Sequence, residues 1–148
     1  MAEVLFYHLE SQSLESVLPS LLEKTLERGW KAVVEIGSEE RAAALEAHLW
    51  TYRDDAFLPH GRDGAGHEAR QPILLTTGTE NANGADVRFF VDRAVPRDTE
   101  GYRRIVFLFS GHDGDAVTEA REAWKALRGA AEVTYWKQDG NGRWSRMG

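Results

Sequence analysis

The stretch "VLFYHLESQSLESVLPSLLEKTLERGWKAVVEIG", residues 4–37, decides the fold because its hydrophobic period changes twice. Residues 4–9 form a short apolar run, which is typical of a buried strand. Between residues 14 and 26 the apolar positions recur with the spacing of one helical face. Residues 31–37 return to a short apolar run. The stretch therefore predicts a strand, a helix and a second strand.

The ends of this first helix carry recognisable signals. Ser13 is placed to cap its start, and Gly29 is placed to end it. Pro19 lacks an amide hydrogen and clashes with a preceding helical turn. Pro19 therefore either kinks the helix or lies in its true first turn, and the sequence leaves both readings open.

The remaining chain continues the alternation of strands and helices. Ser38 starts a second helix, and strand-like runs follow at residues 72–77, 87–92, 104–110 and 132–138, with a helix over 115–128 before the last of them. Nearly all-apolar strands that alternate with helices indicate a mostly parallel sheet covered on both faces. We expect a single three-layer α/β/α domain over residues 1–148. Residues 139–148 form either a hairpin or a frayed C-terminal extension, and residues 61–69 read as a flexible loop.

Composition limits what the protein can do. The chain has 148 residues, a formal net charge of −6 and no cysteine. An acidic protein is poorly suited to binding nucleic-acid phosphates, so no direct nucleic-acid binding is expected. The absence of cysteine excludes disulfides and cysteine-ligated zinc, and it fits a reducing compartment. No segment has the features of a signal peptide or a membrane span, so we expect a cytoplasmic protein with no membrane partner.

An α/β sheet suggests a nucleotide, but the motifs that bind one are missing. The sequence has no G-x-x-x-x-G-K-[ST] and no G-x-G-x-x-G after a strand. Glu10 lies in the link between the first strand and helix, where it would repel a phosphate. The sequence therefore predicts a Rossmann-like fold without a nucleotide site and without a cofactor.

The segment "SGHDGD", residues 110–115, lies at the end of an apolar strand, where α/β enzymes place catalytic groups. His112, Asp113 and Asp115 could bind a metal or act as an acid and base, which would make the protein a small metal-dependent hydrolase. The simpler interpretation is that the glycines form a turn and an aspartate caps the next helix. We favour the turn and keep the hydrolase as the alternative.

The histidines offer a second potential metal site. His60, His67 and His112 match no zinc spacing, and no carboxylate is regularly placed beside them. We therefore expect surface histidines on loops, no metal and no catalytic residue.

The helix over 115–128 carries two adjacent stripes. Arg121, Lys125 and Arg128 form a basic stripe beside Val117 and Trp124 of the apolar one. Cations bordering an aromatic on an acidic protein suit a short acidic peptide with a hydrophobic end. The alternative is a solvated basic face with Trp124 in the core.

The segment "LWTYRDDAFLPHG", residues 49–61, places aromatic side chains in a charged segment that ends in proline and glycine. Trp50, Phe57, Leu58 and Pro59 either fold back onto the sheet as a loop plug or form an exposed interface patch.

Several segments together resemble one family, the chi subunit of bacterial DNA polymerase III. They are "VLFYHL", "LLEKTLERGWKAVV", "LEAHLWTYRDDAFLPHG", "QPILLTTG", "AREAWKALR" and "VTYW", and they occur in order over nearly the whole chain. The resemblance implies a non-catalytic accessory subunit of the clamp-loader assembly, without a nucleotide site.

The resemblance also implies two partners. The surface with Trp50, Phe57, Leu58 and Pro59 is expected to contact the psi subunit or an equivalent clamp-loader subunit. The last long helix, through Arg121, Trp124, Lys125 and Arg128, is expected to bind the acidic C-terminal tail of single-stranded-DNA-binding protein, with Val117 beside them.

Overall fold

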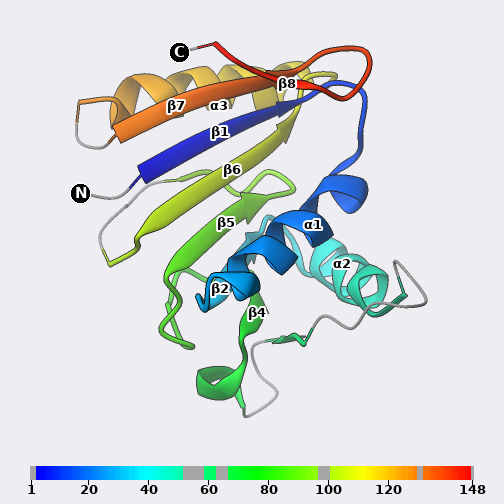
Figure 1. Ribbon diagram of the computed structural model, residues 1–148, viewed down its shortest axis with the longest axis vertical. Helices are drawn as coiled ribbons and strands as arrows, with labels where there is room; N and C mark the ends of the chain where they lie inside the picture. The colour runs from blue at the N-terminus through cyan, green and yellow to red at the C-terminus, as the bar shows by residue number, and fades with distance from the viewer. Residues whose placement is uncertain (1–2, 52–58, 63–66, 97–100, 130–131, 148) are drawn as a thin grey trace.

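The computed structural model describes residues 3–51, 59–62, 67–96, 101–129 and 132–147. Within these ranges one sheet of eight strands runs in the order β3-β4-β2-β5-β6-β1-β7-β8 (Figure 1). All neighbouring strands are parallel except the antiparallel pair β7 and β8. The strands are β1 (Glu3–Leu9), β2 (Ala32–Ile36), β3 (Gly61–Arg62), β4 (Ile73–Thr76), β5 (Val87–Val91), β6 (Arg104–Ser110), β7 (Glu132–Gln138) and β8 (Trp144–Arg146).

The helices are α1 (Leu14–Glu27), α2 (Glu39–Thr51) and α3 (Gly114–Leu127), with a 3-10 turn at Glu68–Arg70. Helices α1 and α2 lie on one face of the sheet and α3 on the other (Figure 1). Side chains alternate along β1, so that Leu5 and Leu9 join the core under α1 and α2, while Val4 and Phe6 join the core under α3. The predicted mostly parallel, three-layer α/β/α fold is confirmed.

The two signals at the ends of α1 act as predicted. The Ser13 hydroxyl accepts a hydrogen bond from the Ser16 amide, which satisfies one of the free donors of the first turn. Gly29 follows the helix with a φ of 78°, a conformation that costs other residues more. Pro19 lies inside α1, more than one turn from its start, and is buried. The first-turn alternative for Pro19 is therefore wrong.

Two segments that the sequence left as irregular are ordered by hydrogen bonds. Gly61–Arg62 pairs as a short parallel strand with β4, so the expected flexible loop over 61–69 is wrong at its two ends; residues 63–66 lie outside the described residues. Residues 139–147 form a hairpin that pairs Gln138 with Trp144, and the Asp139 carboxylate accepts the amides of Asn141 and Arg143 in the turn.

A buried ion pair crosses the middle of the sheet. The Arg88 guanidinium on β5 donates to the Glu35 carboxylate on β2, with Nη2 and Oε1 2.6 Å apart. Arg88 also donates to the carbonyl oxygens of Gly78 and Glu80 and to the Tyr102 hydroxyl. These bonds satisfy a charge that would otherwise be costly to bury. They fix the chain after β4 against the sheet.

Candidate functional site

The sequence-predicted basic helix borders a concave site on the α3 face of the molecule. The Asp113 carboxylate accepts the amides of Asp115 and Ala116 and so fixes where α3 begins. The α3–β7 pocket has a volume of about 290 Å³. Its lining residues are Arg121, Trp124, Lys125, Tyr135 and Met147.

Trp124 is half-buried and serves both the core and the pocket. Its ring meets the rings of Phe6 and Tyr135 edge to face, with centres 5.6 Å and 5.8 Å apart. Edge-to-face contacts of this kind stabilise an aromatic cluster beyond the area that it buries. The two interpretations of Trp124 from sequence, core residue and pocket wall, therefore describe the two sides of one ring.

A chain of hydrogen bonds holds Tyr135 in the pocket wall. The Tyr135 hydroxyl lies 2.6 Å from Nδ1 of His8, and Nε2 of His8 lies 2.8 Å from the Glu10 carboxylate. The tautomer with its proton on Nε2 satisfies both contacts, because Tyr135 then donates to Nδ1 and His8 donates to Glu10. Burial lowers the pKa of His8 and raises the pKa of Tyr135, so both groups are held neutral.

Met147 completes the pocket from the C-terminal hairpin. Its amide donates to the Tyr135 carbonyl oxygen at 2.7 Å, while the residue as a whole is 62% exposed. Sequence reasoning missed both Tyr135 and Met147. Alternation along residues 132–138 could have placed Tyr135 on the face under the last helix, but nothing in the sequence marked Met147.

The basic side chains of α3 are available to a partner. Arg121, Lys125 and Arg128 are exposed, and no carboxylate of the described residues pairs with them. Arg128 lies one turn beyond Trp124 and donates its amide to the Trp124 carbonyl oxygen. Val117 is half-buried against the core under α3. Three of the five predicted residues therefore line the pocket, and Arg128 and Val117 lie outside that lining on the same helix.

The second predicted surface lies at the end of α2. Trp50 is 50% exposed and its ring lies 4.1 Å from the ring of His60. Pro59 is half-buried, and Phe57 and Leu58 lie outside the described residues. His60 is buried, with Nε2 3.2 Å from the Glu46 carbonyl oxygen, so the expectation of a surface position for His60 is wrong. The cause is local packing, since Trp50 and the end of α2 cover its ring.

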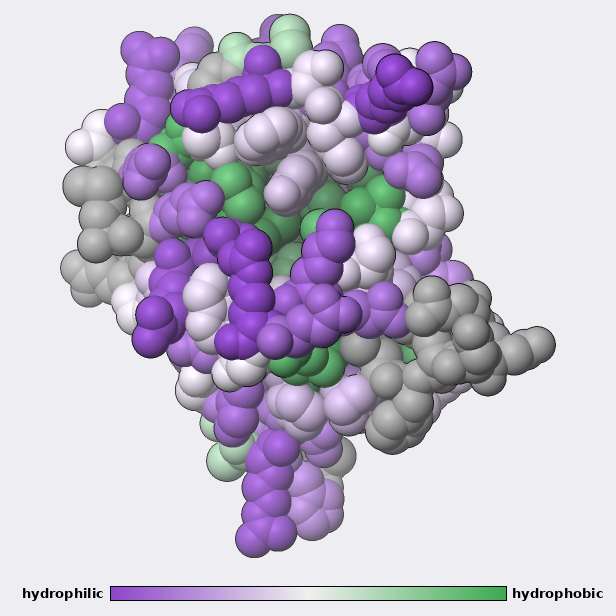
Figure 2. Space-filling view, in the orientation of Figure 1, coloured by the Kyte–Doolittle hydropathy of each residue, from purple (hydrophilic) through white to green (hydrophobic). Residues whose placement is uncertain are grey.

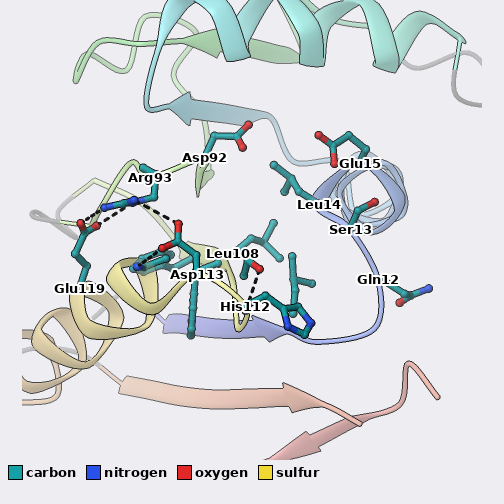
Figure 3. A pocket seen from close by; sticks show the side chains of 15 residues that line it. Gln12, Ser13, Leu14, Glu15, Asp92, Arg93, Leu108, His112, Asp113 and Glu119 are labelled. Carbon is teal, nitrogen blue, oxygen red and sulfur yellow. Dashed lines mark hydrogen bonds and ion pairs between the residues drawn. The ribbon is translucent and has the colours of Figure 1, made fainter. Parts of the chain in front are cut away.

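The "SGHDGD" segment borders a second pocket, of about 310 Å³, at the carboxyl ends of β1 and β6 (Figure 3). Helices α1 and α3 leave these two strands toward opposite faces, which is where α/β proteins often bind ligands. Arg93 lies between Asp113 and Glu119 and pairs with both (Figure 3). Asp113 therefore neutralises Arg93 in addition to capping α3.

Two of the three candidate metal ligands of this segment, His112 and Asp113, have other partners. Nε2 of His112 lies 2.7 Å from the Glu10 carbonyl oxygen, and Asp113 caps the helix. Within the part of the chain that the structure describes, no three or more histidine, aspartate or glutamate side chains are grouped to hold a metal ion. The turn-and-cap interpretation of Asp113 is confirmed.

One known protein family matches most of this chain. The family model for "DNA polymerase III chi subunit, HolC" matches residues 1–133. The chain belongs to the chi subunit family. It is 25% identical over 117 residues to the DNA polymerase III subunit chi of Haemophilus influenzae, covering 78% of this chain and 81% of that protein. It is 26% identical over 111 residues to the subunit of the same name in Pseudomonas aeruginosa, covering 73% and 77%.

A further chi relative is matched over a shorter part. The chain is 30% identical over 87 residues to the probable DNA polymerase III subunit chi of Rickettsia prowazekii, covering 59% of this chain. The matched part spans about half, 53%, of that protein. Among the described residues, no helix combines the length and apolar character needed to span a bilayer.

Proposed function

We propose that this chi-family protein is a non-catalytic accessory subunit that links the clamp loader of DNA polymerase III to single-stranded-DNA-binding protein. The α3–β7 pocket binds the acidic C-terminal tail of that protein. The observation that carries the proposal is the pocket itself, where two aromatic rings meet two cations that pair with no carboxylate of the described residues.

Charge and shape both suit such a tail. Arg121 and Lys125 place positive charge at the pocket of a protein whose formal net charge is −6, so an acidic peptide is drawn to this site more than to its surroundings. A guanidinium binds a carboxylate through two parallel hydrogen bonds, which suits a chain terminus. The volume of about 290 Å³ lies at the small end of ligand pockets and suits a bulky apolar side chain between Trp124 and Tyr135.

The proposed contact with the clamp loader is the surface around Trp50. A half-exposed tryptophan packed against a buried histidine is a typical anchor for a protein partner, because tryptophan contributes much of the energy of many interfaces. Trp50 and Pro59, together with Phe57 and Leu58 of the same segment, form the proposed contact with the psi subunit or an equivalent clamp-loader subunit.

Size-exclusion chromatography of the full chain with single-stranded-DNA-binding protein from the same bacterium tests the link. The intact partner should co-elute with the chain, and the same partner without its C-terminal tail should elute separately. Co-elution of both forms would place the contact on the partner's DNA-binding domain and would contradict the proposal.

A further inference from the structure

A separate concave site lies at the C-terminal end of α1, where the strands of the sheet begin. Figure 2 shows that the face carrying α1 is hollowed, with hydrophobic side chains at its floor and hydrophilic ones around it. The α1-end pocket has a volume of about 210 Å³. Its apolar floor is formed by Leu5, Leu21, Val87, Phe89 and Val106, and its rim by Tyr7, Lys24, Thr25, Arg28, Trp30 and Arg104.

The rim of this pocket is basic. It holds Lys24, Arg28 and Arg104 and contains no carboxylate. Arg104 pairs with Glu3, with Nη2 and Oε2 3.2 Å apart. Within the described ranges, no carboxylate pairs with Lys24 or Arg28. Two positive charges at the pocket are therefore uncompensated on a protein that is acidic as a whole.

Several guanidinium groups at this site lie close to the ring of Trp30. The Cζ atoms of Arg28 and Arg104 lie 5.3 Å and 5.5 Å from the centre of its ring. Arg103 lies 5.9 Å from the same ring and is paired with Asp86 at 3.3 Å. An aromatic face attracts cations, and so it holds together groups that would otherwise repel one another. The charges are thus partly ordered before any ligand arrives.

The pocket also has donors without acceptors. Nε of Arg104 is buried and has no hydrogen-bond partner in the described part of the chain. Tyr7 is half-buried, its hydroxyl makes no hydrogen bond among the described residues, and burial raises its pKa. Buried polar groups in native proteins are normally paired, so an unpaired donor calls for an explanation. An anion in the pocket would offer the Tyr7 hydroxyl an acceptor.

Cations at the end of a helix have a simpler role, which must be considered first. Lys24 and Arg28 lie at the C-terminus of α1, where positive charge stabilises the free carbonyl groups. That role explains neither Arg104, which comes from β6, nor the placement of Trp30 against three guanidinium groups.

We propose that the α1-end pocket binds a phosphomonoester. The phosphate group lies at the basic rim, and the apolar substituent lies on the floor. A terminal phosphate carries a charge of about −1.5 to −2 at neutral pH, which matches the two uncompensated cations. A backbone phosphodiester or a carboxylate carries only one negative charge. The formal net charge of −6 further opposes a long polyanion.

Nuclear magnetic resonance titration of the full chain with phenyl phosphate, at constant ionic strength, tests the site. Phenyl phosphate should shift the Trp30 indole signal saturably and bind about tenfold more tightly than benzoate, which has one charge fewer. Inorganic phosphate should compete. Arg28→Gln and Lys24→Gln should each weaken binding about tenfold. Arg143→Gln is the matched control, because it removes one exposed cation in the hairpin turn, which does not line the pocket, and it should bind like the wild type.

Three outcomes would overturn the proposal. One is the absence of saturable shifts with either phosphate probe. Another is unchanged binding by folded Arg28→Gln and Lys24→Gln, which would leave these cations only their role at the helix end. The third is stronger binding of benzoate, or of a single-stranded oligonucleotide that carries only phosphodiesters.

Discussion

Nε2 of His48 lies 2.7 Å from the backbone carbonyl oxygen of Glu15. This oxygen would accept the amide hydrogen of residue 19 in an unbroken helix, but residue 19 is Pro19 and has none. A side chain of α2 thus satisfies the acceptor that the proline leaves open in α1. The Arg41 guanidinium, also on α2, donates to the Glu15 carboxylate at 2.5 Å, so both polar groups of Glu15 join the two helices.

His48→Ala should lower the free energy of unfolding by about 1 kcal/mol, because it removes the donor to the Glu15 carbonyl oxygen. His48→Gln, which keeps a donor, is the matched control and should cost less. In a Pro19→Ala background the amide of residue 19 supplies the missing donor, so His48→Ala should cost less there. Urea unfolding of the double-mutant cycle measures this difference. Equal costs in the two backgrounds would contradict the compensation.

Arg88→Met should be strongly destabilising, by about 3–5 kcal/mol, because it removes the cation that pairs with the buried Glu35 carboxylate. Adding Glu35→Leu to Arg88→Met should recover much of the loss, since two apolar groups then replace the pair. Denaturant unfolding of the single and double variants checks both values. A double variant no more stable than Arg88→Met would show that the pair itself is not the cause.

Trp50→Ala should leave the free energy of unfolding nearly unchanged and abolish binding to the clamp-loader partner. The reason is that Trp50 is half-exposed and packs on His60 at the surface end of α2. Phe89→Ala is the contrasting control, because Phe89 is buried and its truncation should cost about 3–5 kcal/mol. Thermal unfolding and co-purification with co-expressed clamp-loader subunits separate the effects. A loss of stability for Trp50→Ala as large as that for Phe89→Ala would favour the loop-plug interpretation.

The protein should lose stability in mild acid in part through His8. Burial lowers the pKa of His8 in the folded state, although the hydrogen bond to Glu10 opposes this shift. The unfolded chain therefore binds a proton more readily, and the contribution of His8 is lost as the pH falls below about 6.5. His8→Gln should show a shallower fall in melting temperature between about pH 7.5 and 5.5 than the wild type. Parallel curves for the two proteins would contradict this assignment.

Much of the fold followed from local sequence signals. The changes of hydrophobic period, the Ser13 cap and the Gly29 terminator are set by neighbouring residues, and the structure has them where the sequence indicated. Contacts between distant segments could not be read in this way. The Arg88–Glu35 pair joins residues 53 positions apart, and no local pattern distinguishes those residues from exposed charges.

The same distinction between local signals and distant contacts holds for the residues of the candidate site. Arg121, Trp124 and Lys125 share one helix, so helical spacing alone brought them together. Tyr135 and Met147 reach the pocket through the β7–β8 hairpin, whose position depends on strand pairing across the sheet. His60 was misjudged for a related reason, since the residue that covers it, Trp50, is ten positions earlier.

Fluorescence anisotropy of a labelled peptide with the sequence of the partner's acidic tail tests the central claim most directly. The wild type should bind with roughly micromolar affinity, about −8 kcal/mol, because a mobile peptide must be ordered, and binding should weaken as salt rises. Arg121→Glu and Arg128→Glu should weaken binding more than Lys125→Ala, since they add repulsion as well as removing a cation. Trp124→Ala should remove the apolar wall and also weaken binding. Unchanged affinity for folded Arg121→Glu, Arg128→Glu and Trp124→Ala variants would show that the tail binds elsewhere.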